Sequence, residues 1–194
     1  VMNAVLITPA GYFSQGTKFD WPDETAASFL TAQMAEHNSL SVAEPLNATD
    51  NNLIHPRSLK ARGEKLVPAS FFGLPVLYGL LAKVTGLSAA LYFTLIFFCV
   101  ALYGLYEIIK RFGSTRWAFL SVLLVMAHPG QWYYTLHSYL PNVLFLSLAI
   151  IAAWLLVNKK NIAAGLVFGL AVLVRPSELY WLVFLILGFI YFVL

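Results

Sequence analysis

The sequence predicts an all-α, polytopic helical membrane bundle with a long outer loop that contains juxtamembrane helices. Of its 194 residues, 60% are hydrophobic and 11% are charged, whereas soluble domains carry about 45–50% apolar and about 25% charged residues. A chain with so few charged residues does not have enough of them to form the surface of a water-soluble protein. Seven of the nine acidic residues lie between positions 11 and 68, and only Glu107 and Glu178 follow. A polar loop therefore precedes an apolar half.

The composition also narrows the class of protein. A net charge of +3 does not indicate a nucleic-acid partner. The single cysteine, Cys99, excludes an internal disulfide. The apolar segment Val1–Ile7 has no basic residue before it and is too short to cross a bilayer. Since the sequence also stops inside an apolar run at Leu194, we expect a fragment, cut inside its first and last helices and inactive alone.

Three segments are predicted. Residues 1–10 are the remnant of a first transmembrane helix, residues 11–87 an outer loop with juxtamembrane helices, and residues 88–194 a bundle of about five spans, the last truncated. Within the loop, a helix is expected to follow a cap at Asp20 or Trp21 and to run to about His37, because Pro22 and the acids after it suit a first turn. Its apolar face comprises Ala26, Phe29, Leu30 and Met34.

Six apolar runs follow the polar segment. The first is interrupted by Gly73 and Pro75, the second is long enough to span a bilayer, and Pro129 ends or kinks the third. The runs are Ala69–Gly86, Ser88–Ile109, Trp117–Tyr134, Leu140–Val157, Ile162–Val174 and Leu179–Leu194.

The distribution of basic residues predicts the orientation. The linker 110–116 holds three basic residues and the linker 158–161 holds two, whereas the linker 128–139 holds no lysine or arginine. Basic linkers face the cytoplasm, so the third linker and the polar loop face outward. This orientation requires that residues 69–86 lie along the outer surface instead of crossing.

The adjacent acids Asp23 and Glu24 are the strongest candidates for chemistry. On the outer side, after a membrane helix, such a pair suits a general base and a metal ligand. The same two charges also suit the positive end of a helix, and composition alone favours that simpler interpretation. Elsewhere we expect Glu107 to pair with Arg111, its i,i+4 neighbour.

Four segments, in the same order along the chain, resemble GT-C membrane glycosyltransferases, which include protein O-mannosyltransferases and bacterial aminoarabinose transferases. Phe19–Ala27 is similar to their Asp-Glu motif in the first outer loop. Lys65–Leu77 resembles the proline-containing segment before a juxtamembrane helix, and Lys83–Gly86 resembles the end of that helix. Gly165–Pro176 resembles a glycine-rich helix that closes in Arg-Pro.

The resemblance implies a polyprenyl-phosphate sugar donor, bound on the outer side of a bacterial or archaeal cytoplasmic membrane. Asp23 would take the proton from a lipid, glycan or protein acceptor while the lipid phosphate leaves with inversion, and Glu24 would support it. Many members carry a second acid where this chain has Asn142. An amide holds a hydroxyl or phosphate but is no base. No cofactor or metal ligand is therefore assigned, and a divalent cation stays an alternative.

Four further residues are expected to contact substrate, each with a simpler alternative. Arg175 would pair with a phosphate or extend to the interface. Tyr133 would stack on a sugar or belong to an aromatic belt. His137, in the second outer loop, would contact substrate or be a hydrogen-bonded interfacial residue, and it lacks metal-ligand spacing. Lys65 belongs to a basic cluster that is either solvated or meets lipid headgroups or a pyrophosphate; the cluster also holds Arg57, Lys60 and Arg62.

Two other classes of function remain open. Secondary transporters carry broken helices and charges at mid-membrane, whereas the predicted spans have almost no ionisable residues at mid-depth. A non-catalytic membrane scaffold would hold Asp23 away from any cavity.

Overall fold

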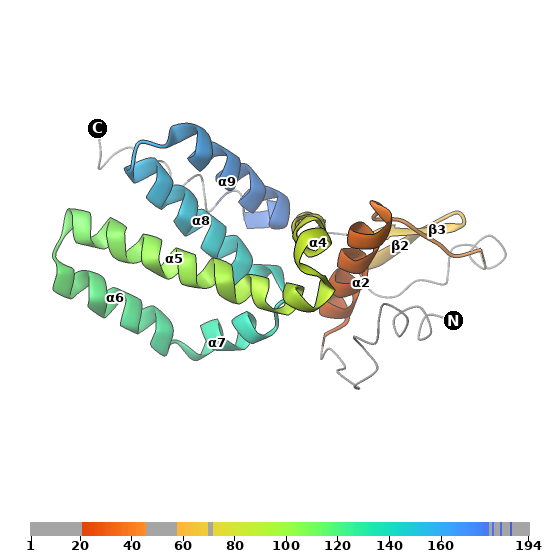
Figure 1. Cartoon of the computed structure of the whole chain (residues 1–194), viewed down its shortest axis with the longest axis horizontal. Coiled ribbons are helices and arrows are strands. Elements are labelled where there is room, and N and C mark those ends of the chain that lie inside the picture. The colour runs from red at the N-terminus through yellow and green to blue at the C-terminus, as the bar shows by residue number, and fades with distance from the viewer. Residues whose placement is uncertain are drawn as a thin grey trace. The chain divides into compact units, whose positions relative to one another are not determined.

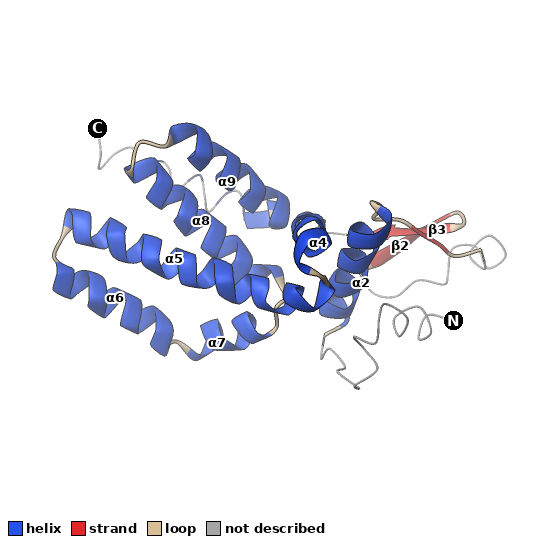
Figure 2. Ribbon diagram, in the orientation of Figure 1, coloured by secondary structure: helices blue, strands red, loops and turns tan. Residues whose placement is uncertain are grey.

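The structure, a computed structural model, describes residues 21–45, 58–69 and 72–178, together with three single positions near the end of the chain. The predictions for residues 1–10, for the irregular segment 47–57 and for most of the last apolar run lie outside the described residues. The described chain is mostly helical with one small sheet (Figures 1 and 2). It divides into two compact units: unit 1 runs to Phe93 and includes His137–Leu140, and unit 2 holds the rest.

Helix α2 of unit 1 spans Pro22–His37, as predicted. Trp21 precedes it in an extended conformation, and Pro22 occupies the first turn, where its missing N–H costs nothing. Asn38 ends the helix with a φ of 54°, a left-handed conformation that asparagine tolerates. Three members of the predicted apolar face are buried and Met34 is half-buried.

A three-stranded antiparallel sheet packs on α2, which the all-α prediction missed. Its strands are β1 (Val42–Ala43), β2 (Leu59–Arg62) and β3 (Lys65–Pro68), in the order β1-β3-β2. Side chains alternate between the faces of a strand. Leu59 and Leu66 are therefore buried with three apolar residues of α2, while the lysines and the arginine of β2 and β3 are exposed on the opposite face.

Helix α4, Gly73–Thr85, follows the sheet. Gly73 and Pro75 were expected to interrupt this run, but both lie in the first turn of the helix, where proline is tolerated. With 13 residues, α4 is shorter than the roughly 20 that a span needs. It contacts α2 closely at Gly79, where an added Cβ would meet Met34 Cβ at 2.5 Å. Gly86, with a φ of 88°, ends the helix.

A short 3-10 turn, η1 (Leu87–Ala89), leads into α5, which spans Ala90–Phe112. Within the described residues, Leu87–Phe112 is the one continuous helix that is long and apolar enough to cross a membrane. It includes the predicted run 88–109. Helix α5 begins in unit 1 and continues into unit 2.

Unit 2 contains four further helices in the described chain, and Pro129 opens the second of them, as the expected kink implied. Helices α7 and α8 are bent by 108° at their break, and together they are long and apolar enough for a broken span or a re-entrant loop. The helices are α6 (Thr115–Ala127), α7 (Pro129–Leu136), α8 (Pro141–Val157) and α9 (Asn161–Val174), followed by the 3-10 turn η2 (Pro176–Glu178).

Helices α5 and α8 are joined at two places in unit 2. The ring of Tyr103 meets that of Trp154 edge to face, with centroids 5.5 Å apart. At the second-last residue of α5, Arg111 donates a hydrogen bond of 3.0 Å to the carbonyl of Val157, the last residue of α8. The expected pair of Arg111 with Glu107 is therefore wrong: Glu107 lies 3.7 Å from Lys110, because Arg111 satisfies a helix-terminal carbonyl instead.

Candidate functional site

Asp23 and Glu24 lie in the first turn of α2 in very different surroundings. Successive helical residues point about 100° apart, and this geometry turns the two carboxylates to different sides. Asp23 is exposed and accepts a hydrogen bond from the hydroxyl of Ser58. Glu24 is only 2% exposed. The two acids that the sequence treats as a pair are thus one reachable group and one enclosed group.

One partner of Glu24 is His137. Nδ1 of His137 lies 3.0 Å from Oε2 of Glu24, and the two side chains are 18% and 3% exposed. A carboxylate removed from water needs a hydrogen-bonded or charged partner, because its desolvation otherwise costs several kcal/mol. Both residues belong to unit 1. The structure therefore brings together two of the predicted site residues that lie far apart in the sequence.

The segment that follows His137 is firmly held within unit 1. The hydroxyl of Ser138 donates to the carbonyl of Leu91 at the start of α5. The next residue, Tyr139, is buried and its ring packs against Tyr78 of α4, with centroids 6.2 Å apart. These contacts fix the backbone from which His137 extends. The imidazole is consequently held in place toward α2 by the fold around it.

Lys65 also belongs to unit 1, at the first position of β3. It is exposed on the outer face of the sheet, directly opposite Ala43 on one side and Arg62 on the other. Lys60 lies on the same exposed face of β2. The predicted basic cluster is therefore a sheet face, apart from Arg57, which lies outside the described residues.

The other three predicted site residues belong to unit 2. Asn142 is the second residue of α8 and lines a cavity within that unit. Tyr133 lies on α7, with its ring edge-on to that of Tyr134 at 5.2 Å. Arg175 caps the end of α9, and its Nη2 lies 3.3 Å from Oε1 of Glu178. A phosphate bound at Arg175 would therefore compete with an existing carboxylate partner.

Sequence reasoning missed two features of this site. It gave no role to Ser58, because a lone serine in a polar loop carries no pattern. It also treated Glu24 and His137 separately, although an acid in one predicted outer loop and a histidine in the next are the kind of residues that pair. Across residues 21–45, 58–69 and 72–178, no three histidine, cysteine, aspartate or glutamate side chains gather as a metal site.

Comparisons with protein-family models, with curated proteins and with solved structures found no match to this chain. The likeness to GT-C glycosyltransferases consequently rests on the four sequence segments alone.

Proposed function

We propose that this chain is part of a polytopic membrane glycosyltransferase of the GT-C type, in which Asp23 is the general base. The enzyme would move a sugar from a polyprenyl-phosphate donor to a lipid, glycan or protein acceptor on the outer side of the membrane. The apolar helix Leu87–Phe112, the bent pair α7–α8 and the basic linkers support a polytopic membrane location.

One arrangement carries the proposal: an accessible carboxylate stands beside an enclosed one. A general base must be reachable by the acceptor, and Asp23 is exposed at the first turn of α2. A neighbouring acid that only caps the helix has no need of burial. Glu24, however, is buried and paired with His137. We infer that this pair positions the helix start from which Asp23 extends.

The proposed reaction is a direct displacement. Asp23 accepts the proton of the acceptor hydroxyl or amine, and the acceptor atom forms a bond to the anomeric carbon of the sugar. The bond between that carbon and the phosphate oxygen breaks, and the lipid phosphate leaves with the electron pair. Inversion follows from attack opposite the leaving group. Arg175 and Lys65 remain the predicted cationic partners of the phosphate. Tyr133 remains a predicted contact to the sugar, and Asn142 one to a substrate hydroxyl or to the phosphate.

The test is the Asp23→Asn variant of the full-length protein in membranes. Sugar transfer is measured from radiolabelled polyprenyl phosphates that carry mannose, glucose or aminoarabinose. A general base contributes about 10²–10⁴-fold, so we expect kcat to fall by that factor with little change in KM. Glu36→Gln is the matched control, because Glu36 is an exposed acid at the other end of the same helix. Transfer at the wild-type rate by Asp23→Asn overturns the assignment.

A secondary transporter is the second candidate, favoured by the 108° bend between α7 and α8. Broken helices form substrate sites in transporters. On that hypothesis, proteoliposomes would show uptake that depends on Asn142 at the break and is unaffected by Asp23→Asn. The glycosyltransferase hypothesis predicts no uptake and full dependence on Asp23.

A further inference from the structure

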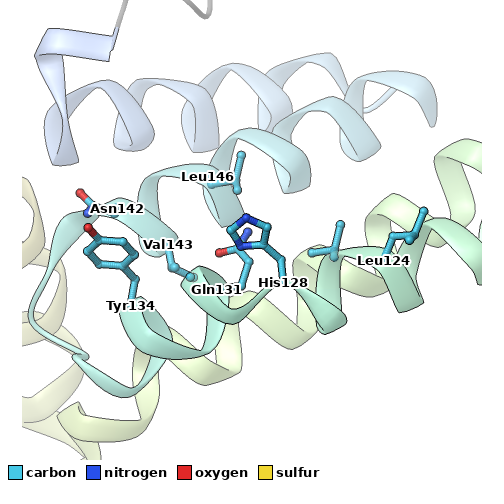
Figure 3. A pocket seen from close by; sticks show the side chains of 9 residues that line it. Leu124, His128, Gln131, Tyr134, Asn142, Val143 and Leu146 are labelled. Carbon is cyan, nitrogen blue, oxygen red and sulfur yellow. The ribbon is translucent and has the colours of Figure 1, made fainter.

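A cavity of about 470 Å³ lies between α6, α7 and α8, entirely within unit 2 (Figure 3). This volume falls within the range of ligand pockets, about 300–1,000 Å³. The lining surface is mostly apolar, and polar side chains contribute a small part of it. The polar lining residues are His128, Gln131, Tyr134 and Asn142, and the others are Leu124, Val125, Gly130, Val143 and Leu146. The cavity thus opens beside the break between α7 and α8.

The four polar side chains are uncommitted. Each can donate and accept hydrogen bonds without carrying a formal charge when the imidazole is neutral. Within the part of the chain that the structure describes, none of the four side chains hydrogen-bonds another protein group. Hydroxyls on the same helices behave differently, since Ser121 and Thr135 each donate to a carbonyl of their own helix. His128 and Tyr134 are exposed and the other two are half-buried, so all four are accessible to a ligand with several hydroxyls.

A glycine helps to shape this polar part. A Cβ at Gly130 would approach Cε1 of His128 to 2.9 Å, which real Cβ atoms do not do. The missing side chain therefore leaves room for the imidazole, which lines the same cavity as Gln131 (Figure 3). Any larger residue at this position would displace the ring.

The cavity changes character along its length. In Figure 3, Tyr134 and Asn142 lie at one end, His128 and Gln131 near the middle, and Leu124 at the other end. Leu120 lies one turn before Leu124 on α6, and both are well exposed. An apolar surface thus continues from the cavity along α6. Such a site accommodates a polar head and an alkyl chain in one molecule.

The lining also excludes one kind of head. None of the nine lining residues is an aspartate, glutamate, lysine or arginine. A phosphate bound here would lose its hydration without a charged partner, which is costly. An uncharged head rich in hydroxyl groups has a much smaller desolvation cost, because amide, phenol and imidazole groups form hydrogen bonds with it in place of water.

We propose that this cavity binds a lipid with an uncharged sugar head, the sugar lying at the break between α7 and α8 and the alkyl chain along α6. This inference rests on the lining of the cavity and not on the proposed function, although Asn142 is also a predicted contact of the glycosyltransferase substrate. The proposed ligand differs from a lipid phosphate because its head is uncharged, and it differs from a free sugar because it carries an alkyl chain.

The probe is a glucosyl diacylglycerol with a photoreactive diazirine in its acyl chain. The full-length protein is reconstituted in phosphatidylcholine vesicles that contain this lipid. We expect irradiation to label α6 near Leu124, and unlabelled glucosyl diacylglycerol to prevent it. In Gln131→Leu/Asn142→Leu, we expect labelling to fall at least about tenfold, since each lost hydrogen bond costs about 1 kcal/mol.

Matched variants separate the cavity from the fold. Asn158→Leu makes the same chemical change directly after the other end of α8, outside the cavity, and should label normally. If the double variant does not fold, Leu146→Trp serves instead, because Leu146 is a partly exposed lining residue that a larger side chain would push into the cavity. Asp23→Asn should also label normally, so that a failure of the proposed catalysis stays distinguishable.

Three outcomes would overturn the proposal. Labelling unaffected by both cavity variants would place the lipid elsewhere. Equal competition by phosphatidic acid would contradict selection for an uncharged head. Equal competition by free glucose at the same concentration would show that the alkyl chain contributes nothing.

Discussion

Nδ1 of His137 lies 3.0 Å from Oε2 of Glu24, and the carboxylate is almost completely enclosed. Removing one partner of a buried pair leaves the other desolvated and uncompensated. We therefore expect His137→Ala and Glu24→Ala each to lower the free energy of unfolding by about 3 kcal/mol, measured by denaturant or thermal unfolding in detergent micelles.

The same helix provides a matched control for this pair. Glu36 and His37 lie 3.9 Å apart at the exposed end of α2. Because exposed pairs contribute about 0–1 kcal/mol, Glu36→Ala and His37→Ala should change stability little. In a double-mutant cycle, Glu24→Ala with His137→Ala should cost clearly less than the sum of the single changes. A strictly additive result would contradict the coupling of the two residues.

Gly79 allows α2 and α4 to approach each other. A Cβ at this position would meet Cβ and Cγ of Met34 at 2.5 and 2.7 Å. We expect Gly79→Ala to destabilise by about 1–3 kcal/mol through overpacking, although alanine is the better helix former. Gly165→Ala is the control, since nothing lies within 4 Å of its Cβ, and it should be neutral or stabilising by up to about 1 kcal/mol. Equal thermal shifts in the two variants would refute the close approach.

Arg111 makes a cross-helix hydrogen bond that the sequence did not predict. Its guanidinium donates to the carbonyl of Val157 at the end of α8. Arg111→Met should cost about 1–2 kcal/mol, because the charged donor also complements the negative helix end. Lys110→Met removes the surface pair with Glu107 and should cost less than about 1 kcal/mol. Unfolding midpoints that rank the two variants in the opposite order would argue against this contact.

The predicted orientation is testable with single cysteines. Cys99 is the one native cysteine, so Cys99→Ala gives a background without thiols. We expect Arg62→Cys, on the exposed face of β2, to react with a membrane-impermeant maleimide in intact cells. Arg116→Cys, in a basic linker, should react only after permeabilisation. The reverse pattern would place the polar loop in the cytoplasm and remove the basis for an outward-facing site.

Helices that begin at a proline or at acidic residues were predictable from the sequence. Pro22 and the acids after it defined the start of α2, and Pro129 defined the break before α7. The sheet was not predictable in the same way. Its strands are at most four residues long. Strand β1 also pairs with β3, which lies more than 20 residues later in the sequence, so no local sequence pattern predicts the pairing.

The candidate site was predictable as residue types but not as geometry. Its acids follow from motif and position, yet which acid is buried depends on how α2 rotates against the sheet and α4. The partner of Glu24 comes from 113 positions away. Likewise, Arg111 had an attractive i,i+4 partner in Glu107, and tertiary structure offered it a better acceptor.

The turn between β2 and β3 has a consequence for which changes this chain can accept. Gly63, with a φ of 61°, sets the register in which Arg62 faces Lys65. Adding or deleting one residue in either strand would turn every following side chain of that strand to the opposite face of the sheet. Charged side chains would then be buried against α2, and Leu59 or Leu66 would be exposed. Substitutions on the basic face are therefore tolerable one at a time, whereas changes of length between positions 59 and 68 are not. Among related chains, the spacing should vary less than the residues themselves.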